Sequence, residues 1–398
     1  MSSRVNILAP DFRADPYPVY ARLRREAPVS LVDPVGMWAI SRYEDALYVM
    51  KNPQLFSSRG IMAATEPPWL GRTNPVSDSL IAIDPPRHTR LRALVNRAFT
   101  PAAVARLEPF VRTVVEELAS KVVSGNTLDF VETFALPLPA NVIGELLGLD
   151  VSLRARFKQW ADIIITAATL PPDAVELHDR MRNTLAEMDR YFHEVVESRR
   201  RQPGDDMVSE LLRAQVDGQS LSESELMGFF YLLLLAGLET TVHMLSHCAI
   251  MLARKPDVQA RLRAEPALIP RFIEEVLRCE PPVHSTLRVT TSEVELSGVK
   301  LPPGTPVLVL LASAQRDESF CPNGDEFSLE RTNQGNMAFG HGIHFCLGAP
   351  LARLEARVAL EVLLSRSSGI FLRQEQIQWN LAPTARGPVV LPMEWKPR

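Results

Sequence analysis

The segment from Leu226 to Ala253 is almost free of charged residues and is long enough to cross a bilayer, which takes roughly 20 helical residues. Its centre carries Glu239, and a carboxylate at mid-bilayer costs about 2.5–3.5 kcal/mol on insertion scales. A helix that is apolar nearly all round also fits the middle of a large soluble core. We therefore expect a long buried helix and no membrane association.

Local signals predict where this helix begins and ends. Ser222 and Glu225 form a capping box at its start, and Pro256 ends the pattern. Most of the remaining chain has helical periodicity. Strand-like alternation is concentrated in three regions, Val29 to Ser41, Thr286 to Ala314 and Gly369 to Glu394. The pattern predicts a mainly α fold with a minor β part, organised as a single domain over residues 1–398.

The composition restricts the partners and the compartment. Among the 398 residues, 46% are hydrophobic and 23% are charged, so the chain can bury a large core. The net charge of -4 leaves no general basic surface for nucleic acid. The four cysteines are widely scattered, and the N-terminus lacks the pattern of a secretory signal. We expect a cytoplasmic protein without a disulfide framework.

The strongest chemical signal is the glycine-rich segment Phe339 to Gly348, which contains Cys346. Glycines let the backbone come close to a bulky group and adopt positive φ where needed. Pro350 belongs in the first turn of the helix that follows, so the Cys346 sulfur is expected near the positive end of a helix dipole. That position favours a thiolate, and a thiolate held by peptide N–H groups suits an axial iron ligand.

Two simpler interpretations of this segment compete. A free cysteine is most often a small buried hydrophobe. A zinc site made of His341, His344 and Cys346 is the second, although a structural zinc site normally adds a paired cysteine ligand that the neighbouring sequence lacks.

The segment is similar, position for position, to the cysteine loop of the cytochrome P450 haem-thiolate enzymes, F-G-x-G-x-H-x-C-x-G. By this resemblance the chain is identified as a member of the soluble bacterial type. The resemblance implies the cytochrome P450 fold, with its long central helix across haem b. It also implies that Cys346 is the metal ligand.

The resemblance extends to residues around the haem. Asp84-Pro85 is predicted to begin a helix on which His88 and Arg92 share one face. Taken alone, such a pair would suit a solvated basic helix. Its likeness to a family segment that binds a haem propionate assigns it instead to the cofactor. The implied cofactor-binding residues are His88, Arg92, Ala236, Gly237, Arg288, Phe339, His344 and Cys346.

Two further segments resemble family motifs. Glu275 and Arg278 match the E-x-x-R element, which in the family meets an arginine matched here by Arg331. Alone, this spacing would suggest an ordinary surface salt bridge. The resemblance implies a structural role in holding the cysteine loop.

The stretch from Ala236 to Thr241 resembles the oxygen-activation motif A-G-x-[DE]-T-T. A helical threonine can turn its hydroxyl onto the carbonyl four residues earlier, here that of Ala236. Without the resemblance, a glutamate and a threonine tolerated in a buried helix would be the better interpretation. The resemblance implies that Glu239 and Thr240 are the catalytic residues that supply protons to dioxygen.

The substrate pocket is predicted by counting from the family motifs. His284 could equally be a packing residue, a solvated one or a hydrogen-bond donor to substrate. The loop from Ser58 to Ser79 should form a lid. Three positions depart from the common bacterial pattern, namely Leu238, Gln315 and Asn336. The residues expected to face the substrate are Leu232, Leu235, Ala236, His284 and Ala385.

The implied activity is hydroxylation or epoxidation of a hydrophobic small molecule, such as a terpenoid, steroid, fatty acid or polyketide-like compound. It uses O2 and two electrons from a ferredoxin or flavodoxin with its reductase. Arg90 and Arg97 share a helix face and are predicted to help bind this acidic partner. A haem-based sensor, a cysteine hydrolase using Cys346 with His344, and a peroxide-driven enzyme are the alternatives.

Overall fold

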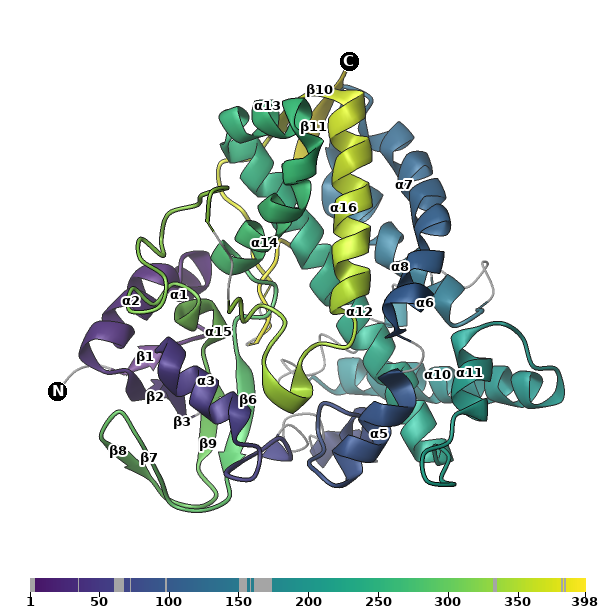
Figure 1. Ribbon diagram of the computed structural model, residues 1–398, viewed down its shortest axis with the longest axis vertical. Helices are drawn as coiled ribbons and strands as arrows, with labels where there is room; N and C mark the ends of the chain where they lie inside the picture. Colours follow the sequence, from purple (N-terminus) through teal and green to yellow (C-terminus); the bar gives the residue numbers. More distant parts are fainter. Residues whose placement is uncertain are drawn as a thin grey trace.

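The computed structural model describes residues 4–34, 36–60, 68–71, 73–96, 99–149, 156–157, 159–160, 174–331, 335–380, 382 and 384–398. Helices make up most of these residues; the largest sheet lies to one side of them, and a smaller one lies among the helices near the C-terminus (Figure 1). The mainly α fold with a minor β part is therefore confirmed.

Helix α12 (Glu223–Arg254) has 32 residues and runs through the middle of the molecule, with α16 (Ala349–Arg366) beside it (Figure 1). The other α-helices of the described residues are α1 (Pro10–Ala14), α2 (Tyr17–Glu26), α3 (Tyr43–Lys51), α5 (Arg87–Asn96), α6 (Pro101–Arg106), α7 (Glu108–Val122), α8 (Pro137–Leu146), α10 (Val175–Arg201), α11 (Met207–Arg213), α13 (Pro256–Ala264), α14 (Ile269–Cys279) and α15 (Leu311–Ala314). Short helical turns are η1 (Pro68–Leu70), η2 (Pro75–Asp78), η4 (Val131–Ala135), η6 (Pro266–Leu268) and η7 (Gly342–His344).

Helix α12 begins and ends where the sequence predicts. The Ser222 hydroxyl accepts from the Glu225 N–H at 3.2 Å, and the Ser222 N–H donates to the Glu225 carboxylate at 3.0 Å. Pro256 begins α13. By length and composition α12 could cross a membrane, but most of its apolar window is buried inside the protein. The expected long buried helix is confirmed.

The hydrophobic core is built on both halves of α12. From Val242 onward the helix packs with α7, α14 and α16 into one cluster of buried side chains. From Leu226 to Leu238 it joins a second cluster with α10 and η2. The stretch between Leu232 and Thr240 is the part of α12 where partly accessible side chains gather. This is the stretch in which the sequence predicts the catalytic residues.

Most strands form where alternation predicts them, but β1, β4 and β5 lie outside the three predicted regions, and the end of the second region is helix α15. One sheet has the order β1-β2-β3-β9-β6-β4, a second pairs β10, β11 and β5, and a third pairs β7 with β8. Within the predicted third region β10 and β11 pair antiparallel, but a long connection separates them. The strands of the described residues are β1 (Val5–Asn6), β2 (Val29–Asp33), β3 (Met37–Ile40), β4 (Phe56–Ser57), β5 (Thr127–Asp129), β6 (Thr286–Thr290), β7 (Val294–Leu296), β8 (Val299–Leu301), β9 (Pro306–Val309), β10 (Ser367–Leu372) and β11 (Pro392–Pro397).

The start of α5 differs from the prediction. The helix begins at Arg87 and not at Pro85. The Asp84 carboxylate does not cap it, because it accepts from the Ser57 hydroxyl at 2.5 Å and from the Ser58 N–H at 2.9 Å. Asp84 thereby ties the end of β4 to the start of α5.

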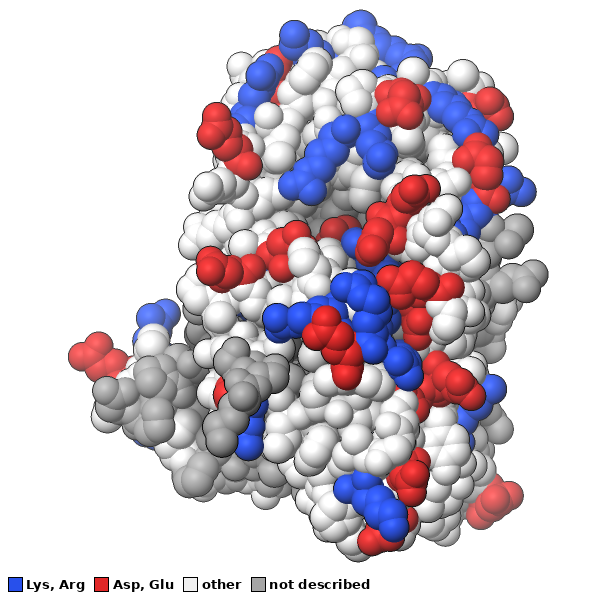
Figure 2. Space-filling model, turned by 90° about the vertical axis from the view of Figure 1, so that its left-hand side faces the viewer, with Lys and Arg blue, Asp and Glu red and all other residues white. Residues whose placement is uncertain are grey.

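The surface carries charges of both signs. On the face shown in Figure 2, basic and acidic side chains are interspersed, and no wide area carries a single sign. This agrees with a chain whose 43 Lys and Arg residues nearly balance 47 Asp and Glu residues.

Candidate functional site

Cys346 lies in a tight loop between η7 and α16. Its N–H donates to the Phe339 carbonyl at 2.8 Å, and the N–H groups of Gly348 and Ala349 bind its sulfur. Gly342 has φ +68°, and a Cβ there would clash with the carbonyl oxygen of Met50 on α3. Only glycine fits this position without strain. The loop therefore holds one sulfur at the start of a helix, as the sequence predicts.

Opposing effects act on the pKa of the Cys346 thiol. Burial raises the pKa of the thiol, while the N–H groups of Gly348 and Ala349 and the charge of Arg92 act in the opposite direction. Burial is the largest of these effects, and the N–H groups of the helix start act toward the thiolate, as predicted. A metal cation would reverse this balance, because a coordinating thiol is deprotonated. Cys346 keeps accessible surface through which such a cation can reach it.

The four predicted propionate partners lie together. The rings of His88 and His344 are 4.5 Å apart, and the charges of Arg92 and Arg288 act on His344. His88 is buried, and neither of its ring nitrogens has a hydrogen-bond partner among the described residues. Burial lowers the pKa of Arg288 to about 10.

The protein itself only partly balances the positive charge of this cluster, through the charge of Asp84, which acts on His88 and Arg288. Within the described part of the chain, neither Arg92 nor Arg288 forms an ion pair with a carboxylate. A buried cation or donor without a partner is unfavourable, so such a cluster suits an anionic ligand. Two guanidinium groups and an unpaired histidine next to Cys346 fit the two carboxylates of a haem.

His344 also anchors the predicted lid. Its Nε2 is 2.9 Å from the Ser58 hydroxyl, and its ring forms a hydrogen bond with the backbone of Leu80. Ser58 is the first residue of the segment expected to form the lid, and Leu80 directly follows its last residue. Residues 61–67 and 72 of that segment lie outside the described residues.

The middle of α12 presents an accessible stretch. Ala236 is exposed although Leu234 and Leu238 beside it are buried. The Thr240 hydroxyl donates to the Ala236 carbonyl at 2.5 Å, which is the predicted back-bond. Ala236 therefore faces open space and not the core, next to the Thr240 hydroxyl.

Three apolar side chains border the same region. Leu232 and Leu235 are partly buried and pack, together with Leu347 of the cysteine loop, against the second core cluster. Gly237 has another role, because a Cβ there would lie 2.7 Å from the Ile143 side chain. Its missing side chain lets α12 pack closely on α8, a packing reason that the sequence does not reveal.

Glu239 is a largely buried carboxylic acid. Burial raises its pKa to about 7, and a hydrogen bond from the Asn380 amide acts in the opposite direction. The Asn380 Nδ2 donates to Glu239 Oε1 at 3.3 Å. Sequence reasoning missed Asn380, because nothing in its surrounding sequence indicates a contact with α12.

Two predicted substrate residues lie in the core. His284 is 2% exposed, its ring packs near those of Tyr17 and Tyr20, and its Nδ1 is 3.4 Å from the Tyr20 hydroxyl. Burial holds the pKa of His284 well below its ordinary value. Ala385 is 6% exposed, and its carbonyl accepts from Arg13 at 3.0 Å. Neither residue presents open surface, since Tyr17 and Tyr20 of α2 contact His284 and Arg13 of α1 contacts Ala385. For His284 this fits the packing alternative, and a substrate contact of either residue stays a prediction.

The E-x-x-R prediction is confirmed. Arg278 donates to both oxygens of Glu275 at 2.8 Å, and Arg331 Nε donates to the same carboxylate at 3.2 Å. Arg278 also donates to the carbonyls of Gly324 and Glu326. The network thus ties α14 to the chain that leads into the cysteine loop.

Of the two predicted partner-binding arginines, only Arg90 lies among the described residues. Arg90 is paired with the carboxylate of Glu225 at the start of α12, and it also donates to the Ser220 carbonyl. Its charge is therefore partly balanced by Glu225, and its role in partner binding stays a prediction. Arg97 lies outside the described residues.

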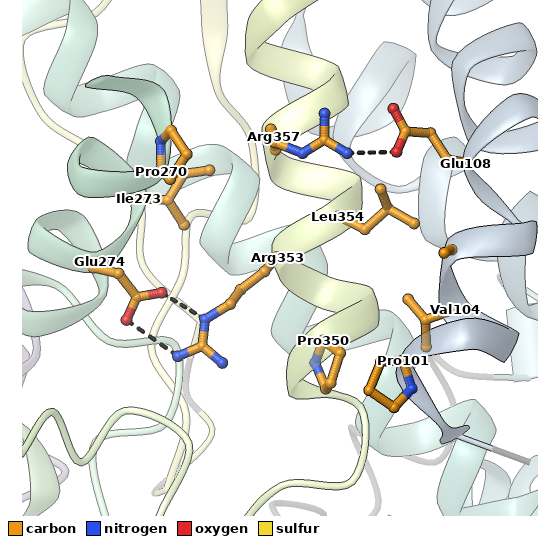
Figure 3. Close-up of a pocket in the computed structure, with 11 residues that line it drawn as sticks. Pro101, Val104, Glu108, Pro270, Ile273, Glu274, Pro350, Arg353, Leu354 and Arg357 are labelled. Carbon is orange, nitrogen blue, oxygen red and sulfur yellow. Dashed lines mark hydrogen bonds and ion pairs between the residues drawn. The ribbon is translucent and has the colours of Figure 1, made fainter. Parts of the chain in front are cut away.

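A groove of about 350 Å³ lies beside the start of α16, between α6, α7 and α14 (Figure 3). Arg353 and Glu274 pair across one side of it, and Arg357 pairs with Glu108 on the other. Pro350, four residues after the metal-ligand candidate, contributes to its apolar floor. The groove thus adjoins the cysteine side of the site.

The zinc alternative finds no support in the described residues. No group of three or more His, Cys, Asp or Glu side chains among them is arranged to hold a metal ion. One sulfur with peptide donors, next to unpaired cations, is the arrangement of a haem-thiolate protein.

Comparison with known proteins agrees with this class. The family model described as Cytochrome P450 matches residues 31–384. Cytochrome P450 109 of Bacillus spizizenii is 40% identical over 363 residues, which cover 90% of this chain and 86% of that protein. The chain belongs to the cytochrome P450 family, whose cofactor is haem b with an axial cysteine thiolate. It is a P450 monooxygenase.

Solved structures are similar over nearly the whole length. CYP109Q5 from Chondromyces apiculatus superposes with a TM-score of 0.92 at 39% identity and covers all of both chains. CYP109E1 from Bacillus megaterium in complex with corticosterone superposes with a TM-score of 0.86 at 34% identity, and the match covers 96% of this chain and 99% of that one. The predicted P450 fold is confirmed.

Proposed function

We propose that this monooxygenase hydroxylates or epoxidises a hydrophobic small molecule of steroid or polyketide size. The enzyme uses O2 as co-substrate, and it receives two electrons from a ferredoxin or flavodoxin with its reductase. The observation that carries the proposal is the placement of Cys346, one sulfur with two peptide donors beside a cluster of unpaired cations. Residues 1–398 are proposed to act as a single domain in the cytoplasm.

The roles of the residues follow from their positions. When bound, haem b supplies electron transfer and the activation of dioxygen. Cys346 holds the haem on one side through its sulfur. His88, Arg92, Arg288 and His344 bind its carboxylates, and Ala236 leaves room for its other side.

Glu239 and Thr240 are proposed to move protons. With a pKa of about 7, Glu239 is present in both protonation states near neutral pH, as a general acid requires. The Thr240 hydroxyl is bound to Ala236 in this structure and can turn toward the accessible side of α12. The two groups are adjacent and can pass a proton to the same water.

Leu232 and Leu235 are proposed to contact the substrate, because they are apolar, partly accessible and close to Ala236. The corticosterone complex of the similar CYP109E1 supports a flat, hydrophobic substrate of that size. Titration of the holoenzyme with steroids, terpenoids, fatty acids and macrolides tests this class. The compound that shifts the haem absorption band at the lowest concentration identifies it, and a response to small polar compounds alone would contradict the proposal.

The electron donor is proposed to dock on the groove of Figure 3, since this face adjoins Cys346. Arg353→Gln should slow reduction by the partner at low salt, because it removes a cation from the groove. Arg261→Gln is a matched control, since Arg261 is also a partly exposed arginine paired with a glutamate, but it lies on α13. Chemical reduction by dithionite should be equal in all three proteins. If the redox partner reduces Arg353→Gln as fast as the parent protein, this face is excluded as the docking site.

The function itself is tested by the reduced carbon monoxide spectrum. Thiolate ligation should give a strongly red-shifted Soret band, and Cys346→His should lose that band together with product formation. A histidine-type spectrum in the fresh parent protein would contradict the proposal.

A further inference from the structure

We propose that Asn380 is a positioning residue that holds Glu239 for proton delivery, and that Arg13 fixes the orientation of the Asn380 amide. The inference rests on the proposed role of Glu239. A chain of hydrogen bonds thereby connects α1, the C-terminal segment and α12, although these elements are far apart in the sequence.

The hydrogen bonds determine which way the amide points. Arg13 Nη2 donates to the Asn380 carbonyl at 2.8 Å, to its side-chain Oδ1 at 3.0 Å and to the Ala385 carbonyl at 3.0 Å. The Gly387 N–H also approaches Oδ1, at 3.4 Å. Because Oδ1 faces two donors, the amide nitrogen must point to the other side, where it meets Glu239 Oε1 at 3.3 Å. Arg13 thereby selects the rotamer that presents a donor to the acid.

The charge of Arg13 strengthens this donor. Arg13 is 6% exposed, and within the described residues it forms no ion pair with a carboxylate. Its charge is held by neutral carbonyl and amide oxygens, so it polarises the Asn380 amide and makes Nδ2 a better donor. A guanidinium in the N-terminal helix thus acts on an acid in α12 through one intervening side chain.

Two opposing effects set the pKa of Glu239, and they show what the hydrogen bond from Asn380 does. Burial raises the pKa of Glu239 to about 7, and the bond from Asn380 opposes this rise. Without Asn380 the acid would remain protonated at higher pH and would release its proton less readily. A group with a pKa near the working pH transfers protons most efficiently, and Asn380 keeps Glu239 in that range.

The other titratable and charged groups nearby do not replace this effect. His243 lies one turn further along α12, and burial lowers its pKa to about 3, so it is neutral. His247, a further turn on, is neutral for the same reason. Arg386 from the C-terminal segment acts on Arg13 and on His247. Burial and the Asn380 bond are the two influences that act on Glu239 itself.

The test measures the protonation of Glu239 directly in the holoenzyme. The infrared band of its protonated carboxyl is identified as the band that Glu239→Gln removes, and it is followed against pH. Asn380→Ala should move the midpoint up by about one pH unit, a tenfold change in proton affinity, because a hydrogen bond to the charged form is lost. Arg13→Gln should move it in the same direction by less. Arg13→Lys keeps the charge and should restore most of the parent value.

A matched control separates positioning from loosening of the structure. Arg386 joins the same segments through the carbonyls of Arg13 and Ala14 but does not contact the Asn380 amide. Arg386→Gln should therefore leave the midpoint in place. An equal shift in Arg386→Gln, or no shift in Asn380→Ala with a normal carbon monoxide spectrum, would overturn the inference.

Failure of the proposed function gives a different result. If Glu239→Gln turns over like the parent enzyme, the acid has no role in proton delivery. The infrared midpoints would still report whether Asn380 and Arg13 control the carboxyl. Parallel changes in the midpoint and in the pH profile of turnover support both proposals together.

Discussion

Replacing Glu275 by Gln should destabilise the protein more than any surface change, because Glu275 is the central anion of a buried network. Its side chain is fully buried, and Arg278 beside it is only 5% exposed. The carboxylate accepts two bonds from Arg278, one from Arg331 and one from the Ser328 N–H. Glutamine turns an amide N–H₂ group toward guanidinium donors and leaves a buried charge uncompensated. Breaking such a pair from one side costs about 3–5 kcal/mol.

The assay is denaturant unfolding of the holoenzyme, followed by circular dichroism and by the thiolate carbon monoxide band. The unfolding midpoints reported by the two probes should shift together, because the network anchors the chain that leads into the cysteine loop. Glu117→Gln is a control at the exposed pair with Lys121 and should leave the midpoint unchanged. A double-mutant cycle with Arg278→Met isolates the coupling between the two charges. A loss below about 1 kcal/mol in Glu275→Gln would refute the reasoning.

Three further predictions concern single residues. Thr240→Ala should keep the normal carbon monoxide spectrum but divert reduced cofactor to hydrogen peroxide, and product formed per cofactor consumed should fall several-fold. Gly342→Ala should cost about 1–3 kcal/mol and loosen haem binding, whereas Gly298→Ala, also at positive φ but in open space, should cost less in thermal unfolding. Burial raises the pKa of Glu355 to about 8 from an ordinary 4.5, so its burial destabilises the fold increasingly as pH rises between these values. Glu355→Gln should therefore gain stability relative to the parent above pH 8, by up to about 4–5 kcal/mol in denaturant unfolding, and little at pH 4.5.

Features that depend on neighbouring residues could be predicted from the sequence. The capping box at Ser222 forms within four residues, and it appears in the structure with both of its bonds. The cysteine loop is also local, because its glycines, its sulfur and the following helix start all lie within one short segment. The start of α5 was misplaced for a physical reason, since Asp84 bonds to Ser57 and Ser58 across the fold. A capping signal in the sequence cannot show that its carboxylate is already used elsewhere.

Contacts between segments that are distant along the chain could not be predicted from the sequence. The sequence leaves three roles open for His284, and its packing against Tyr17 and Tyr20 of α2 is visible only in the folded chain. Asn380 and Arg13 are separated by 367 positions, and their contact with each other is visible only in the folded chain. Neither residue belongs to a motif, because one polar side chain in a loop and one arginine in a short helix have no special pattern.

The buried charges of the protein fall into two groups that differ in how they are compensated. Glu275 and Arg278 neutralise each other within the chain, so their network is complete without a ligand. Arg288 is buried and Arg92 is half-buried, and neither forms an ion pair with a carboxylate among the described residues, although the charge of Asp84 acts on Arg288. His88 beside them has no hydrogen-bond partner among these residues. Like charges close together destabilise the fold, so binding of the haem carboxylates would remove an unfavourable energy that Asp84 offsets only in part. Haem binding is therefore coupled to the stability of the region around Cys346, since a ligand that binds only the folded state stabilises it. The cations that repel one another in the protein are therefore the groups that would bind the haem carboxylates.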